Sequence, residues 1–86
     1  MRLNVLIYGA GAIGRGYLPW ILNKKSKISY VENNINVVNF FKKNNFFYSL
    51  MIKNQKYINK KVSFENIFLF GEEKEFINNY DLIILC

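Results

Sequence analysis

Short apolar runs alternate along the chain with stretches in which apolar residues recur at helical spacing. Leu3–Tyr8 and Asp81–Cys86 are nearly continuous apolar runs, which is typical of strands buried on both faces of a parallel sheet. Ile28–Glu32 predicts a second short strand, and Ile67–Phe70 predicts another that ends at Gly71. We therefore expect the core of the protein to be a sheet whose strands are separated by helices.

Three stretches predict helices: residues 12–24, about ten residues from Ile35 to the Asn44-Asn45 pair, and the segment that begins with Glu72, Glu73 and Glu75. Within the first stretch, Pro19 removes a hydrogen bond and clashes with the carbonyl of Arg15, so we expect a kink there with the helix retained. The carboxylates of the third stretch lie at the positive end of its expected dipole, which favours a helix start at this point.

The remaining strands predict an insertion in the alternating pattern. Phe47–Ile52 and Tyr57–Phe64 read as strands joined around Asn54-Gln55, as a hairpin or meander. The element order predicts an α/β fold of partial Rossmann type, a doubly wound parallel sheet with this insertion after the second helix. Because a buried last strand needs neighbours and covering helices, we expect residues 1–86 to be the N-terminal part of a dinucleotide-binding domain, with its remainder and the catalytic domain absent.

Composition excludes several classes of protein. With 51% hydrophobic and 17% aromatic residues among 86, the chain has enough apolar surface to fold, which excludes intrinsic disorder. Its single cysteine, Cys86, excludes a disulfide framework and a Cys/His zinc site, so no metal is expected. Since no apolar run reaches the ~18 residues of a membrane helix, we expect no membrane partner and a cytoplasmic, reducing location.

The net charge of +6 comes from 12 basic and 6 acidic residues. Asn, Ile and Lys, whose codons are A/T-rich, supply 34 of the 86 residues, so compositional drift explains the excess of lysine without a nucleic-acid partner. Residues 42–61 do interleave aromatics with lysines, as single-strand binders do, but they lack a recognisable reading motif. We therefore expect no nucleic-acid partner.

The motif that carries chemistry is GxGxxG, formed by Gly9, Gly11 and Gly14 between an expected strand and an expected helix. Gly9 permits a tight turn, Gly11 lets a pyrophosphate approach the backbone, and Gly14 lets the helix lie close to the strand. The helix N-terminus then offers unpaired N–H groups to the phosphates. The candidate cofactor-binding residues are Gly9, Gly11, Ala12, Ile13, Gly14, Arg15 and Glu32.

Glu32 completes the fingerprint, because it ends the second expected strand 21 residues after Gly11 and is placed to bind ribose hydroxyls. A carboxylate there repels the 2′-phosphate of NADP, so NAD is the expected cofactor and NADP the less favoured one. The competing interpretation is that the glycines only shape a turn and Glu32 is a solvated strand end. Arg15, in the first helical turn, either neutralises a cofactor phosphate or is an exposed helix residue.

Residues 9–17, GAGAIGRGY, resemble the GAGNIGRGF signature of mannitol-1-phosphate 5-dehydrogenases and their relatives in the mannitol (polyol) dehydrogenase family. VENN at Val31–Asn34, the aromatic strand containing Tyr48, and DLIILC at Asp81–Cys86 are similar to segments of the same family. The resemblance spans essentially all 86 residues but only the first part of that family's nucleotide-binding domain. It implies an oxidoreductase that moves a hydride between NAD and a sugar alcohol or its phosphate.

The sequence departs from this signature at Ala12, which replaces Asn, at Glu32, which replaces Asp, and at Pro19. GAGAIG alone also resembles ketopantoate reductases, which usually use NADP, and a non-catalytic NAD-sensing module is a further alternative. The family's catalytic Lys, Asn and His lie in its C-terminal half, so the resemblance brings no catalytic residue to this chain. We also expect Tyr17 and Trp20 to pack in the core and Cys86 to be buried.

Overall fold

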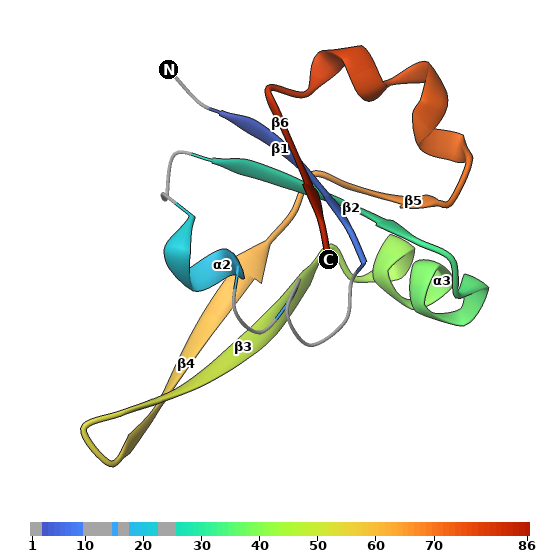
Figure 1. Ribbon diagram of the computed structural model, residues 1–86. Helices are drawn as coiled ribbons and strands as arrows, with labels where there is room; N and C mark the ends of the chain where they lie inside the picture. Colours follow the sequence, from blue (N-terminus) through green and yellow to red (C-terminus); the bar gives the residue numbers. More distant parts are fainter. Residues whose placement is uncertain (1–2, 10–14, 16–17, 23–25) are drawn as a thin grey trace.

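The computed structural model describes residues 3–9, 15, 18–22 and 26–86, and its main sheet has four parallel strands (Figure 1). Their spatial order is β5-β2-β1-β6. The strands are β1 (Asn4–Tyr8), β2 (Lys27–Glu32), β5 (Asn66–Leu69) and β6 (Leu82–Leu85). Val5 of β1 lies opposite Ile28 of β2 on one side and Leu82 of β6 on the other. The fold is therefore mixed α/β, and the expected parallel sheet is confirmed.

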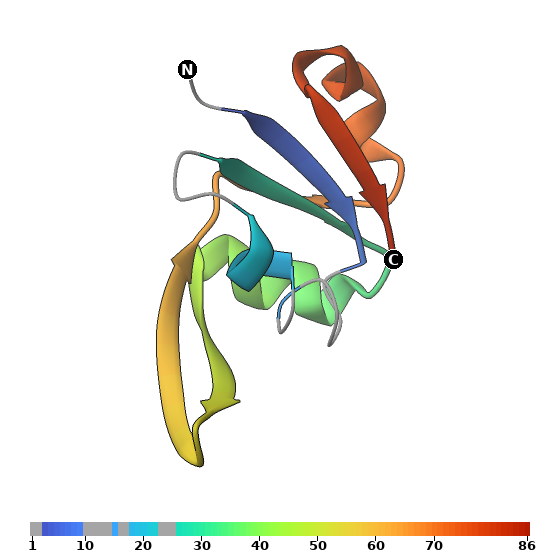
Figure 2. The same ribbon diagram turned by 60° about the vertical axis from the view of Figure 1, so that its left-hand side comes forward.

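One face of this sheet is covered by two helices and a hairpin, as Figure 2 shows. These elements are α2 (Leu18–Ile21), α3 (Ile35–Lys43), β3 (Phe46–Lys53) and β4 (Lys56–Ser63). β3 and β4 pair antiparallel, so the hairpin alternative is confirmed over the meander. The Lys60 Nζ donates a hydrogen bond of 2.8 Å to the carbonyl of Pro19, which ties the hairpin to α2.

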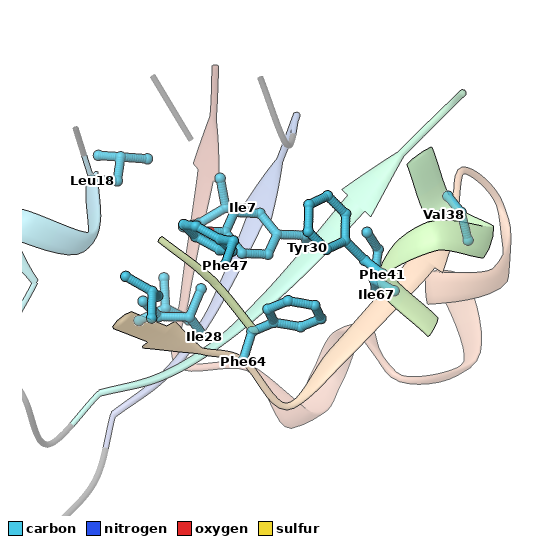
Figure 3. Close-up of a cluster of buried hydrophobic side chains, with 11 residues drawn as sticks. Ile7, Leu18, Ile28, Tyr30, Val38, Phe41, Phe47, Phe64 and Ile67 are labelled. Carbon is cyan, nitrogen blue, oxygen red and sulfur yellow. The ribbon is translucent and has the colours of Figure 1, made fainter. Parts of the chain in front are cut away.

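The core lies between this face of the sheet and the elements that cover it (Figure 3). Tyr30 of β2, only 1% exposed, lies at its centre and makes edge-to-face contacts with Phe47 at 5.9 Å and Phe64 at 5.7 Å between ring centroids. Alternate residues of each strand point into the core because successive side chains of a strand face opposite sides. The cluster comprises Val5, Ile7, Leu18, Ile28, Tyr30, Val38, Phe41, Phe47, Val62, Phe64 and Ile67.

The second helix of the sequence prediction is confirmed as α3, and its start has a clear local cause. The Asn34 side chain caps the helix by accepting a hydrogen bond of 3.0 Å from the backbone N–H of Asn36. Of the first expected helix, over residues 12–24, the structure describes α2 and a helical Arg15. The kink expected between Arg15 and Pro19 lies outside the described residues.

The opposite face of the sheet is covered by two short 3₁₀ helices, η1 (Glu72–Glu75) and η2 (Ile77–Asn79). The prediction of one helix in this region is wrong. Phe76 interrupts the segment with φ −113° and ψ −3°, and its ring stacks on Phe68 of β5 at 5.5 Å. The segment must cross the sheet from β5 to β6 in few residues, and a 3₁₀ helix spans more distance per residue than an α-helix.

The expectation that the last strand is buried is also wrong for the described residues. Leu82 and Ile83 of β6 are 40% and 41% exposed, and Leu85 is 77% exposed. β6 lies at the edge of the sheet, where it pairs with β1 alone among the described strands. An apolar sequence predicted a strand here correctly, but burial depends on neighbours that the local sequence does not specify.

Candidate functional site

The carboxyl ends of the parallel strands meet at one edge of the sheet, where they enclose a hollow of about 220 Å³. Gly9 follows β1, Glu32 ends β2, and Cys86 follows β6. The lining consists of Tyr8, Gly9, Val31, Glu32, Asn33, Phe70 and Cys86. In open α/β sheets, ligands bind in the crevice outside the carboxyl ends of the strands. This hollow is therefore the candidate site.

Gly9 has the conformation that the turn after β1 requires. Its φ of +102° lies in a region that L side chains rarely adopt. Its N–H donates a hydrogen bond of 2.8 Å to the carbonyl of Val31, so the turn is fixed against β2. A Cβ on Gly9 would lie 3.6 Å from the Cβ of Cys86, an ordinary contact distance. Glycine is needed here for its backbone conformation, because a Cβ would fit in the space beside Cys86.

The Glu32 carboxylate is held at the end of β2 by the backbone that follows it. Its Oε1 accepts hydrogen bonds from the N–H of Asn33 at 3.0 Å and of Asn34 at 3.3 Å. These contacts fix the half-buried side chain on the turn between β2 and α3. An ionised carboxylate has about four lone-pair positions, so it can still accept bonds from ligand hydroxyls. Glu32 thus offers an oriented acceptor on the rim of the hollow.

The structure brings together two of the predicted site residues, Gly9 and Glu32, on adjacent strands. Arg15 is half-buried and lies elsewhere: its guanidinium carbon is 5.3 Å from the centre of the Phe41 ring. Burial raises the pKa of Tyr30, and the nearby charge of Arg15 partly opposes that rise. The other predicted site residues, Gly11, Ala12, Ile13 and Gly14, lie outside the described residues, as do Tyr17 and the side chain of Trp20.

Arg15 therefore contacts the core in this structure, and neither of the two roles predicted for it describes that position fully. Its Nε is buried and has no hydrogen-bond partner among the described residues. The cation–π contact with Phe41 places the side chain against α3. Among the residues the structure describes, Arg15 does not line the hollow. A role toward a phosphate remains a prediction from its sequence position.

Five lining residues were not predicted as site residues: Tyr8, Val31, Asn33, Phe70 and Cys86. The Tyr8 hydroxyl donates a hydrogen bond of 2.8 Å to the carboxylate of Glu73, which is only 3% exposed. Phe70 packs edge-to-face on Tyr8, with 6.4 Å between ring centroids. Tyr8 and Phe70 each directly precede a glycine: Gly9 follows β1 at once, and Gly71 lies two residues beyond β5. That shared position was the available signal, although it says nothing about which ring reaches the hollow.

The hydrogen bond between the Tyr8 hydroxyl and the Glu73 carboxylate joins β1 to η1. Burial raises the pKa of the Glu73 carboxyl, but the bonds that it accepts from Tyr8 and from the backbone lower the pKa by more, so it lies below its ordinary value. One of those backbone donors is the N–H of Gly71. For Tyr8, burial and the adjacent carboxylate both raise the pKa of the hydroxyl. Tyr8 therefore stays protonated as a donor, and Glu73 stays ionised as an acceptor.

Cys86 is exposed, which corrects the expectation of a buried position. Its backbone N–H donates to the carbonyl of Tyr8 at 3.2 Å, so the strand pairing places it on the rim of the hollow. A second hollow, of about 250 Å³, lies near the opposite ends of the strands and is lined by residues such as Asn4, Lys27 and Phe76. Ligands of open α/β sheets bind at the carboxyl ends, so the first hollow is the stronger candidate.

No protein-family model matches this chain, and no curated protein matches it. Within the described part of the chain, no cluster of three or more acidic, His or Cys side chains could hold a metal ion. None of the described helices is long and apolar enough to cross a membrane.

Proposed function

We propose that this chain binds the ADP-ribose half of NAD at the carboxyl edge of its sheet, as the N-terminal part of an NAD-dependent polyol dehydrogenase. One observation carries the proposal: Gly9 and Glu32, predicted 23 residues apart as parts of one fingerprint, line the same hollow from adjacent strands. In a dinucleotide site the first glycine forms the turn beneath the pyrophosphate, and the acidic residue binds the ribose hydroxyls. Gly9 and Glu32 lie on the rim of one hollow, as these two roles require.

The order of the strands gives independent support. In chain order the parallel strands are β1, β2, β5 and β6, and in space they lie as third, second, first and fourth. The described helices between β1 and β5, α2 and α3, cover one face of the sheet, whereas η1 and η2, between β5 and β6, cover the other face (Figures 1 and 2). The direction of winding thus reverses between β1 and β6, beside Gly9. Dinucleotides bind at such a switch point in doubly wound sheets.

Glu32 supports NAD over NADP as the cofactor. Its carboxylate is fixed by two backbone N–H groups and cannot easily turn away from a ligand on the rim. A 2′-phosphate about 4 Å away would be repelled by roughly 4 kcal/mol per pair of unit charges at an effective dielectric constant near 20. A ribose hydroxyl would instead donate a charge-assisted hydrogen bond to the same oxygen atoms. This distinguishes the proposal from a ketopantoate-reductase-like enzyme that uses NADP.

The dehydrogenase part of the proposal rests on the resemblance of residues 9–17 to the polyol dehydrogenase signature. On this hypothesis the chain's own residues bind and orient the cofactor. Gly9 shapes the turn and Glu32 binds the ribose, while Phe70 and Tyr8 line the hollow. Hydride transfer to or from a polyol or its phosphate then uses acid and base groups outside these 86 residues. Those groups would also separate a dehydrogenase from a module that only senses NAD.

The test is an NMR titration of the ¹⁵N-labelled chain with NAD and, separately, with NADP. We expect weak binding, in the millimolar range, with amide shifts that concentrate at Gly9, Val31 and Glu32. NADP should produce smaller shifts, and Glu32→Gln should reduce the difference between the two cofactors. Shifts spread evenly over the surface, or equal responses to both cofactors, would contradict the proposal, and micromolar affinity would contradict the expectation of an incomplete site.

Two glycines provide a matched control for the same titration. Gly9 and Gly71 both have positive φ, +102° and +107°, but only Gly9 lines the hollow. Alanine at either position strains the backbone by about 1–3 kcal/mol. Only Gly9→Ala should weaken the response to NAD, whereas Gly71→Ala should lose stability and keep the response. If both variants bind NAD equally, Gly9 has no part in the site.

A further inference from the structure

The β3–β4 hairpin projects from the body of the protein (Figure 2), and several of its apolar side chains are exposed. We call one face of the hairpin the hairpin stripe: Tyr48, Leu50, Ile52 and Tyr57. The four side chains are 54–72% exposed. They share one face because they alternate along β3 and because Ile52 pairs with Tyr57 across the hairpin. The opposite face, at Phe47, Ser49 and Val62, is buried against the body.

The hairpin stripe lies in a part of the sequence that carries positive charge and no negative charge. Residues 33–64 contain six lysines and no Asp or Glu. Lys53 and Lys56 pair with each other at the tip of the hairpin, one position beyond Ile52 and Tyr57, so their side chains leave the strands on the face opposite the hairpin stripe. Lys61 pairs with Tyr48, and its Nζ lies 4.5 Å from the centre of the Phe46 ring. An occupant of this face must therefore offer an apolar surface with carboxylates or other anions around it.

The same molecule carries a surface of that kind. Residues 65–86 contain five Asp or Glu residues and a single lysine. Within them we define the acidic segment as residues 70–76, where Phe70 and Phe76 are 63% and 44% exposed. The exposed carboxylates of Glu72 and Glu75 lie in η1, between these two rings in sequence. The acidic segment thus complements the hairpin stripe in both apolar character and charge.

We propose that the hairpin stripe of one molecule docks on the acidic segment of a second copy, and that the contact is reciprocal about a two-fold axis. Each copy carries both complementary surfaces, so a two-fold pair satisfies two such contacts and closes. Leu50 and Ile52, at the centre of the stripe, lack the rings on which nucleic-acid bases stack, which favours a protein occupant.

The charge pattern makes this proposal testable by charge reversal. Lys61 pairs with Tyr48 on the stripe face, so Lys61→Glu reverses the charge beside the hairpin stripe and leaves the Lys53–Lys56 pair at the tip in place. Glu75→Lys reverses the partner surface while keeping Glu72, which accepts a hydrogen bond from the Leu69 N–H and lies 3.7 Å from Lys42. Lys43→Glu, on α3, reverses a charge outside both surfaces and serves as the control.

Sedimentation velocity of the full chain at low and high salt provides the measurement. We expect a dimer at low salt that dissociates as salt is added, because exposed charge pairs are screened. Lys61→Glu and Glu75→Lys should each weaken dimerisation at least tenfold, while Lys43→Glu should not. An equimolar mixture of the two weakened variants should form a 1:1 heterodimer, since each hairpin then meets a segment of opposite charge.

Three results would overturn the proposal. The first is a protein that stays monomeric at every concentration and salt, even if that monomer binds vesicles of anionic phospholipid through the hairpin. The second is a dimer that the charge reversals do not weaken, which would place the interface elsewhere. The third is a mixture of variants that stays monomeric, which would mean that the two surfaces do not meet. None of these results depends on NAD binding, so the proposal stands or falls separately from the proposed function.

Discussion

The parallel sheet and the β3–β4 hairpin contain similarly apolar strands but bury them to very different extents. Val5, Leu6 and Ile7 of β1 are 0% exposed, whereas Leu50 and Ile52 of β3 are 54% and 65% exposed. β1 has a strand on either side and covering elements on both faces, while the hairpin contacts the body through one face only. An apolar sequence is therefore a condition for burial, and the number of covering layers decides whether the side chains are buried.

The largest expected effect comes from truncating a residue that joins the two regions. Phe41 of α3 is 5% exposed and contacts Phe47 at 6.1 Å and Phe64 at 5.7 Å. Phe41→Ala should cost about 3–5 kcal/mol through lost transfer energy and the cavity left behind. Leu50→Ala, on the hairpin stripe, should cost under ~1 kcal/mol because its side chain is already half in water. Urea denaturation at high salt, where the proposed dimer is dissociated, measures both.

If Leu50→Ala costs as much as Phe41→Ala under these conditions, the hairpin stripe and the core do not differ in burial in solution. The stripe would then pack against the body in solution, and its exposure could not serve a partner. A control at Tyr48→Ala, 65% exposed on the same face, would show whether one side chain or the whole face is buried.

The hydrogen bond between the Tyr8 hydroxyl and the Glu73 carboxylate links the candidate site to η1. Because the folded pKa of Glu73 lies below its ordinary value, the carboxylate stabilises the protein above the unfolded pKa, near 4.3. That stability is lost as the pH falls through the still lower folded pKa. Tyr8→Phe should cost about 1–3 kcal/mol near neutral pH by leaving a buried acceptor without its donor, and should reduce the loss in acid.

Urea denaturation from about pH 7 to about pH 3 measures this effect. Tyr57→Phe is the matched control, since its hydroxyl lies on a side chain that is 72% exposed. The folded pKa of Tyr8 is raised, so its own contribution is present below about pH 10 and is lost as the pH rises through the folded pKa. An unchanged acid profile in Tyr8→Phe would mean that Glu73 is held by backbone donors alone.

The sequence predicted the strands, α3 and the hairpin because their periodicities are local. It did not predict η1 and η2, because the break at Phe76 depends on a ring stack with Phe68 in another strand. It also predicted burial for β6, where the outcome depends on neighbours rather than on the apolar run itself. Local patterns therefore identified most elements, while long-range contacts decided their form and cover.

The candidate site shows the same division. Gly9 and Glu32 could be chosen from motif spacing, because a fixed strand–turn–helix unit imposes that spacing. Cys86 and Phe70 reach the hollow only through the pairing of β1 with β6 and of β2 with β5. Arg15 was assigned from its place near the motif, yet its guanidinium lies over Phe41. Motif spacing thus identifies residues on one unit, and sheet register determines which others join them.

The smallest expected effect lies at the tip of the hairpin, where the chain turns through Asn54 and Gln55. Both have positive φ, +52° and +64°, the conformation of a tight hairpin turn that favours Asn followed by Gly. A non-glycine residue in this region costs roughly 1–2 kcal/mol, although Asn tolerates it better than Gln. Glycine has a larger unfolded-state entropy, worth about 0.5–1 kcal/mol against it. Gln55→Gly should therefore stabilise the protein by a few tenths of a kcal/mol, and Asn54→Gly should not.

Amide hydrogen exchange sharpens this last prediction, because it separates the tip from the core. In the unsubstituted protein, exchange at Lys53 and Lys56, which flank the turn, should need a smaller opening free energy than exchange in β1, which opens only on global unfolding. Gln55→Gly should slow exchange by a similar small factor in both regions, because global unfolding also opens the tip. Equal opening free energies in both regions would mean that the hairpin and the sheet unfold together. A smaller opening free energy at the tip would show instead that the hairpin end opens on its own, which leaves its exposed face free to dock while the sheet and the site beside Gly9 stay intact.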